Sequence, residues 1–230
     1  MAVVAAPRSI VRLIGTPTVP IPRLSTYPCP AAGWLGIGRR GVILNGAKMY
    51  EMSYKDDVEQ GNQKFFGING ELFLVLMYDK GDLIGWVRNS KQGTLTDTLR
   101  VTGAKQTIEA NYKNGTLAFK DELEFGMENG TYMVYQNDGK VVYQSKVKND
   151  KLEGERTISY PNGKLYSREF FIHGDLEGEC NYYWENGNLM VTSNYKRDEL
   201  HGTTKLYDIN GKLKETRMYY DDELISIKKN

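Results

Sequence analysis

The sequence predicts an all-β protein, an elongated antiparallel meander built from β-hairpin repeats of 24 residues each. Two interlocked glycine series predict this fold, because a fixed period of this size indicates a repeat architecture. Both series advance in steps of 24 residues, the second lying nine residues after the first: Gly130, Gly154, Gly178 and Gly202, then Gly139, Gly163, Gly187 and Gly211. No segment keeps the apolar period of a helix. Each unit therefore holds two strands and two turns.

The two turns of a unit are expected to differ. The second glycine usually follows Asn or Asp, as at Asn162-Gly163. These dipeptides supply the positive φ angles of a two-residue type I′ hairpin turn. The other joint, such as Asp198 to Gly202, is expected to be a looser turn.

One face of the sheet is expected to be apolar in every unit. Across a two-residue loop, positions 4, 11 and 17 after the first glycine lie on the same side, and a leucine row at the other joint joins them. These positions hold Val134, Ile158, Tyr182 and Leu206; Val141, Leu165, Leu189 and Leu213; Val147, Phe171, Tyr195 and Tyr219; and Leu152, Leu176, Leu200 and Leu224. We expect this constant face to hold the fold and the opposite, variable face to carry specificity.

The repeat domain is predicted to span residues 41–230. Upstream, Gly61 and Gly70 are again nine residues apart, but the pattern is degenerate at 86–129, where units around Gly93 and Gly115 fill the gap. Stacked hairpins should form one long sheet. Its last strand ends in Lys228 and Lys229, which we expect to discourage edge-to-edge association.

Residues 1–40 do not share the repeat. Residues 1–50 carry six basic groups and no acid, and six of the seven prolines precede residue 31. Three interpretations stay open: a disordered leader, a targeting peptide, or sequence foreign to the domain. Pro7, Arg8 and Arg12 interrupt the apolar stretch that a secretory peptide needs. We favour a disordered or foreign leader.

Composition narrows the classes of function. The net charge of +1 does not indicate nucleic-acid binding. Two Cys and two His exclude a disulfide framework and a His-rich metal site, and no apolar stretch is long enough for a transmembrane helix. We expect no cofactor and a cytoplasmic location, with export or envelope association as the alternative. The sequence leaves the oligomeric state open.

A repeated motif carries a family resemblance. It runs Tyr160-Pro-Asn-Gly-Lys-Leu165, Phe171, Leu176-Glu-Gly178, and again Trp184-Glu-Asn-Gly-Asn-Leu189, Tyr195-Lys, Leu200-His-Gly202. Residues 41–230 thereby resemble the MORN-repeat variant family, which includes bacterial YwqK-like antitoxin components. The chain departs from the pattern at 1–40, at 86–129 and at Ser226, where the family has glycine. The resemblance implies an elongated hairpin sheet, no catalytic residues, and a binding or scaffold role.

Three groups of side chains suggest chemistry, and each has a structural alternative. Cys180 with His173 or His201 could form a thiol nucleophile and a base, but these residues occupy unrelated positions in the repeat. The second group is acidic and is expected to be solvated at loop tips rather than to bind calcium: Glu153, Glu155, Glu177 and Glu179. The third group could stack on sugars, although cross-strand packing is favoured: Tyr182, Tyr183 and Trp184.

The leading hypothesis is therefore a non-catalytic protein-binding module that neutralises a toxin or effector protein. Residues 51–230 carry 24 basic and 29 acidic groups, a net charge of −5, which suits a basic partner. A carbohydrate-binding or cell-envelope module is the alternative, and a membrane-surface scaffold is the second alternative. The predicted partner-binding residues lie on the variable face: Tyr135, Tyr166, Tyr183, Met190 and Tyr207.

Overall fold

The computed structural model describes residues 43–230 except 45, 46, 49, 57 and 68. The expectations for residues 1–40 fall outside this range. The predicted all-β meander is confirmed: strands and turns make up the described residues, and all strand pairs are antiparallel. Within the same range there is no helix long and apolar enough to cross a membrane.

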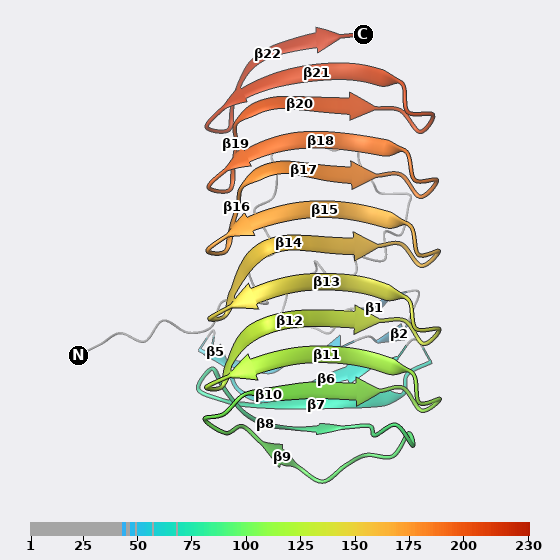
Figure 1. Cartoon of the computed structure of the whole chain (residues 1–230), viewed down its shortest axis with the longest axis vertical. Helices are drawn as coiled ribbons and strands as arrows, with labels where there is room; N and C mark the ends of the chain where they lie inside the picture. The colour runs from blue at the N-terminus through green and yellow to red at the C-terminus, as the bar shows by residue number, and fades with distance from the viewer. Residues whose placement is uncertain (1–42, 45–46, 49, 57, 68) are drawn as a thin grey trace, which may run out of the picture.

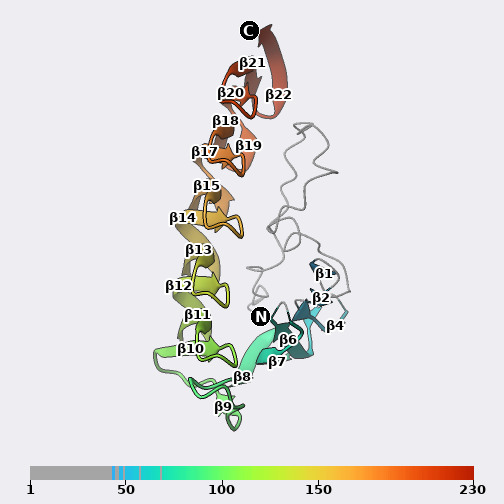
Figure 2. The ribbon, with the colours of Figure 1, turned by 90° about the vertical axis from the view of Figure 1, so that its right-hand side faces the viewer.

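A sheet of thirteen strands forms the tall column in Figure 1. In spatial order its main strands are β10 (Gln106–Asn111), β11 (Leu117–Glu124), β12 (Met127–Tyr135), β13 (Val141–Lys148), β14 (Lys151–Ser159), β15 (Leu165–Ile172), β17 (Gly178–Tyr183), β18 (Leu189–Lys196), β20 (Gly202–Tyr207), β21 (Leu213–Tyr220) and β22 (Glu223–Lys229). The short strands β16 (Asp175–Leu176) and β19 (Glu199–Leu200) pair with β15 and β18. The strands bow, so the sheet forms a trough (Figure 2).

A second, five-stranded sheet contains β3 (Tyr50–Glu51), β6 (Gly61–Phe66), β7 (Leu72–Asp79), β8 (Asp82–Arg88) and β9 (Leu99–Arg100). Two small pairs precede or flank it, β1 (Ile43–Leu44) with β2 (Ala47–Lys48), and β4 (Tyr54–Lys55) with β5 (Val58–Glu59). This sheet folds back onto the lower end of the trough (Figure 2), where the ring centroid of Phe65 lies 5.9 Å from that of Phe119.

We call the face of the large sheet toward β6 and β7 the inner face, and the opposite one the outer face.

The expectation of one continuous sheet is therefore wrong. The ladder is interrupted between β8 and β10, where β9 and an isolated bridge between Asn89 and Leu95 replace a full hairpin. The remainder of the degenerate segment is regular, because β10 and β11 form a hairpin around Gly115. Packing of Phe65 and Phe119 stabilises the fold-back by burying both aromatic rings.

The two turn types are the reverse of those predicted. At Asn162-Gly163 only the glycine has a positive φ, +86°, and Tyr160 donates its N–H to the carbonyl of Lys164. This is a longer turn of type I geometry followed by a left-handed glycine. The tight type I′ turn lies at the other joint, where Arg197 and Asp198 have φ of 52° and 70°.

The longer turn changes which side chains share a face. Ile158 pairs with Ser167 and Ser159 pairs with Leu165, so the register skips Tyr166. Because directly opposed residues share a face, Leu165 lies on the outer face with Ser159. The expectation that position 11 belongs to the constant face is therefore wrong.

Positions 4 and 17 do form the inner face. Together with the leucine row and with residues at other positions, they form three buried clusters: Ile158, Tyr166, Met190 and Val191; Cys180, Tyr195, Leu200 and Tyr219; and Val147, Leu152 and Phe171. A buried polar row crosses the strands between them: Ser145, Arg156, Glu169, Ser193 and Thr204. Leu224 on β22 departs from the pattern, because 45% of its surface is exposed.

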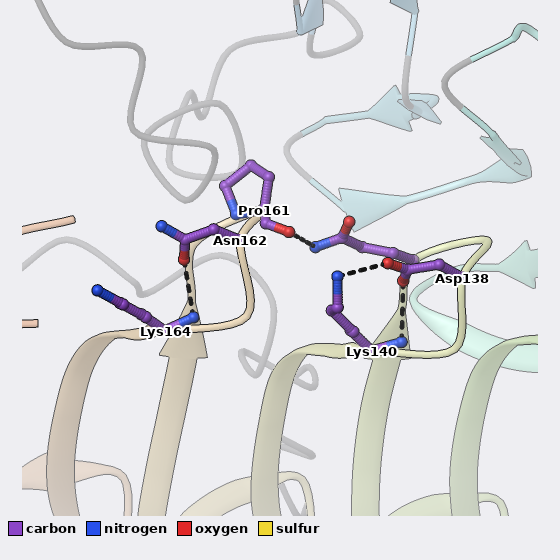
Figure 3. A network of polar contacts seen from close by, with 6 residues as sticks. Asp138, Lys140, Pro161, Asn162 and Lys164 are labelled. Carbon is purple, nitrogen blue, oxygen red and sulfur yellow. Dashed lines mark hydrogen bonds and ion pairs between the residues drawn. The ribbon is translucent and has the colours of Figure 1, made fainter. Parts of the chain in front are cut away.

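Side chains tie successive turns together along both edges of the sheet. Figure 3 shows the Asn-Gly turns, where Asn162 Oδ1 accepts the N–H of Lys164 within one turn. The carbonyl of Pro161 in the same turn accepts a hydrogen bond from Gln136 Nε2 of the preceding turn. At the opposite edge, Asp198 Oδ1 accepts the N–H of Leu176 at 2.7 Å. The asparagine of the Asn-Gly pair therefore forms an Asx turn through its side chain, and its own backbone does not adopt a positive φ.

Candidate partner-binding surface

The inner face is filled by its own side chains. Arg156 Nη2 lies 2.6 Å from Glu169 Oε2, and the hydroxyl of Tyr182 donates to Glu169 Oε1 at 2.8 Å. The guanidinium also stacks 4.5 Å from the ring centroid of Phe171. Burial is the largest single influence and disfavours the charged guanidinium, but the charge and hydrogen bond of Glu169, with Tyr143 and Tyr182, together raise the pKa of Arg156. This polar row joins β14, β15 and β17 on the inner face.

The residues considered for thiol chemistry occupy separate structural positions. Cys180 is fully buried, and burial raises the pKa of its thiol to about 12. His173 Nδ1 lies 3.3 Å from Glu153, whereas His201 Nδ1 lies 2.9 Å from Asp221. A buried neutral thiol is a poor nucleophile. Cys180 therefore acts as an apolar core residue.

The acidic group is partly committed to turns. Glu153 Oε2 accepts the backbone N–H of His173, and Glu177 Oε2 accepts that of Arg197, both at the first residue of a tight turn. Both contacts are exposed, so these two carboxylates support the turns from the solvent-facing surface. Among the described residues, no group of His, Cys, Asp and Glu has an arrangement that could hold a metal ion.

The outer face carries a strip of half-buried aromatic and aliphatic residues beside the Asn-Gly turns. Its cross-strand pairs are Tyr135 with Val141, Tyr183 with Leu189, and Tyr207 with Leu213, and the strip continues through Ser159 and Leu165. We call these residues the Tyr–Leu strip. It brings together three of the predicted partner-binding residues at the same position of three hairpins.

The other two predicted residues lie elsewhere. Tyr166 and Met190 are only 8% and 3% exposed and pack with Ile158 and Val191. The expectation that all five residues share one exposed side is therefore wrong for these two. Each is the residue that the register skips after the longer turn, and that shift carries it into the core.

A comparison with protein-family models matches the MORN repeat variant at residues 152–173, 176–197 and 200–222. These three segments are consecutive MORN repeats. A comparison with curated proteins gives no significant match. Each matched segment spans one hairpin of the large sheet, from β14 and β15 to β20 and β21. MORN repeats are generally non-catalytic binding modules.

Two of the three matched MORN repeats also expose apolar residues that the sequence analysis missed. Phe170 and Ile172 are 45% and 42% exposed, and Met218 and Tyr220 are 42% and 60% exposed. They alternate with inward residues, so they lie on the outer face at the ends of β15 and β21. The sequence contains a signal for these residues. The equivalent positions of the middle MORN repeat hold Asn194 and Lys196, so these positions change between apolar and polar from one repeat to the next, as positions outside a buried core do.

Charged groups surround the first of these apolar pairs. Glu155 and Arg168 form an ion pair of 2.5 Å on the outer face, and Asn181 donates to Glu179 at 2.9 Å. A shallow hollow there is lined by Glu155, Arg168, Glu169, Phe170, Glu179 and Asn181. The outer face of the MORN repeats thus combines exposed apolar side chains with paired charges.

Proposed function

We propose that the chain is a non-catalytic protein-binding module whose MORN repeats present their outer face to a partner protein. One observation carries this proposal. Phe170, Met218 and Tyr220 remain exposed on the outer face, whereas the apolar residues that alternate with them on the inner face are buried. Together with Tyr183 and Tyr207 of the Tyr–Leu strip, they give the aromatic, methionine-containing composition of protein interfaces.

The mixture of side chains favours a protein partner over a carbohydrate. Sugar-binding surfaces use rows of aromatic rings as open platforms, whereas Phe170 and Tyr220 are the only exposed aromatic residues on the outer face of the MORN repeats, and Tyr183 and Tyr207 lie half-buried against leucines. Ile172 and Met218 add exposed aliphatic and thioether surface, which a polar sugar would not complement. The ion pair of Glu155 and Arg168 supplies the polar surroundings of a protein interface.

The narrower proposal is that the partner is a basic toxin or effector protein, which the chain neutralises in the cytoplasm. Two arguments support it. The first is the resemblance to antitoxin components. The second is the net charge of −5 over residues 51–230, which accelerates encounter with a basic protein and disfavours anionic lipid.

Site-specific photo-crosslinking tests the proposal. A photoreactive phenylalanine analogue would replace Tyr183 or Phe170 on the outer face, and Phe125, which is 70% exposed at the turn between β11 and β12, as the matched control. We expect both outer positions to capture the same protein and the control position to capture it weakly. Equal capture at all three positions, or capture at none, would count against the proposal.

A further inference from the structure

The strand β22 has an exposed edge. In the described sheet it pairs with β21 alone, and all seven of its residues are exposed. Leu224, Ile225 and Ile227 are 45%, 57% and 50% exposed, whereas Leu200, in the same leucine row as Leu224, is 1% exposed. The next hairpin covers Leu200 in the large sheet. An edge strand with apolar side chains is a template for another strand.

The backbone of β22 is oriented for such pairing. Asn230 donates its N–H to the carbonyl of Lys214 at 2.9 Å. Hydrogen bonding alternates along an antiparallel strand, so Ile227 and Lys229 direct their N–H and C=O groups away from β21. These groups point toward the position that a further strand would occupy.

The charges of β22 are self-complementary. Asp221 and Asp222 form the tight turn just before it, where they contact His201 and the N–H of Leu200. Glu223 begins the strand, and Lys228 and Lys229 stand at its end. In an antiparallel pair of two β22 strands, the acidic beginning of each copy lies beside the lysines of the other. The lysines that we expected to discourage association therefore lie beside acidic residues of the other copy at both ends of such a pair.

We infer that two copies of this chain associate through antiparallel pairing of their β22 strands. The strand that pairs with the exposed edge of β22 belongs to a second copy of the chain. The charges along β22 run from acidic to basic, so they are complementary to an antiparallel copy of the same strand, as a two-fold symmetric interface requires. The sheet then continues from one copy into the other, with the two inner faces on the same side. Both outer faces stay open, so the dimer presents two copies of the proposed partner-binding surface.

Analytical ultracentrifugation of the full chain and of two charge variants tests this inference. Lys228→Glu/Lys229→Glu makes both ends of β22 acidic, and Asp221→Lys/Glu223→Lys makes both ends largely basic. Each variant alone should sediment as a monomer of about 26.2 kDa, because like charges then face each other. An equimolar mixture should form a heterodimer of twice that mass, and the control Lys196→Glu should dimerise as the wild-type chain does.

A proline variant provides a test that is independent of charge. Ile227→Pro removes an N–H that points away from β21, so it should abolish the dimer and leave the unfolding midpoint nearly unchanged. Circular dichroism verifies that each variant is folded. A wild-type chain that stays monomeric up to about 100 μM would overturn the inference. Dimers that survive in either charge variant alone would overturn it as well.

Discussion

Arg156 and Glu169 form an ion pair across β14 and β15, with 2.6 Å between Nη2 and Oε2. Both side chains are about 95% buried, since each is 5% exposed. A charge in such a place is stable only while its partner is present. The pair therefore fixes the register of these two strands, because a shift of one residue would separate the charges.

Removing one member of this pair should be strongly destabilising. Glu169→Gln should lower the free energy of unfolding by about 3–5 kcal/mol, because Arg156 stays buried without a counter-charge. Glu155→Gln breaks the exposed pair with Arg168 and should cost less than about 1 kcal/mol. Urea unfolding of both variants measures the difference. Equal losses would show that the inner pair is as solvated as the outer one.

A second prediction concerns pH. Asp121 on β11 is 4% exposed, and burial, with the nearby charge of Glu128, raises its pKa well above the usual value. In the unfolded chain this carboxyl loses its proton at about pH 3.9. Between that pH and the raised pKa, the unfolded state binds fewer protons than the folded state, so stability falls as pH rises.

Asp121→Asn removes this titration. The melting temperature should therefore rise at pH 8, where the wild-type chain bears the cost of a buried carboxylate or of its protonation. At pH 3.5 the gain should be much smaller, because the wild-type carboxyl is mostly neutral in both states. Thermal unfolding at the two pH values measures this. The same change at both would mean that Asp121 acts by packing alone.

The third prediction separates the two roles of the turn asparagine. Asn162 accepts the N–H of Lys164 at 2.8 Å and donates to the carbonyl of Glu185 in the next turn at 3.2 Å. Asn162→Ala should cost about 1–2 kcal/mol, and Asn162→Asp, which keeps the acceptor, should cost about half of that. Denaturant unfolding compares them. An aspartate variant as unstable as the alanine variant would assign the effect to the bond between turns.

The hairpin repeat could be predicted because glycine spacing and the apolar positions report the same period. Ile158 and Leu200 were placed correctly on the inner face by this argument. The position of Tyr166 could not be predicted, because Asn-Gly is compatible with a tight turn and with a longer turn. One extra residue reverses the side of every side chain that follows until the register recovers.

The fold-back of the first sheet depends on contacts between residues far apart in the sequence. Phe65 packs on Phe119 only because the segment between β8 and β10 reverses the chain, and no local pattern indicates that reversal. The candidate surface was partly predictable. Tyr183 follows from the variable positions. Phe170 does not, because position 16 adjoins the constant apolar position 17, and its own polarity changes from one unit to the next.

The central claim is that the outer face binds a protein, and an affinity measurement with matched variants tests it most directly. The partner captured by crosslinking would be titrated calorimetrically against the wild-type chain, Tyr183→Ala/Tyr207→Ala, and the control Phe125→Ala. The double variant should stay folded, because neither tyrosine lies on the inner face, and should bind at least about 30-fold more weakly, as expected for the loss of about 2 kcal/mol at a hot spot. The control should bind like the wild type. Unchanged affinity in the folded double variant would contradict the account and place the binding site on another surface.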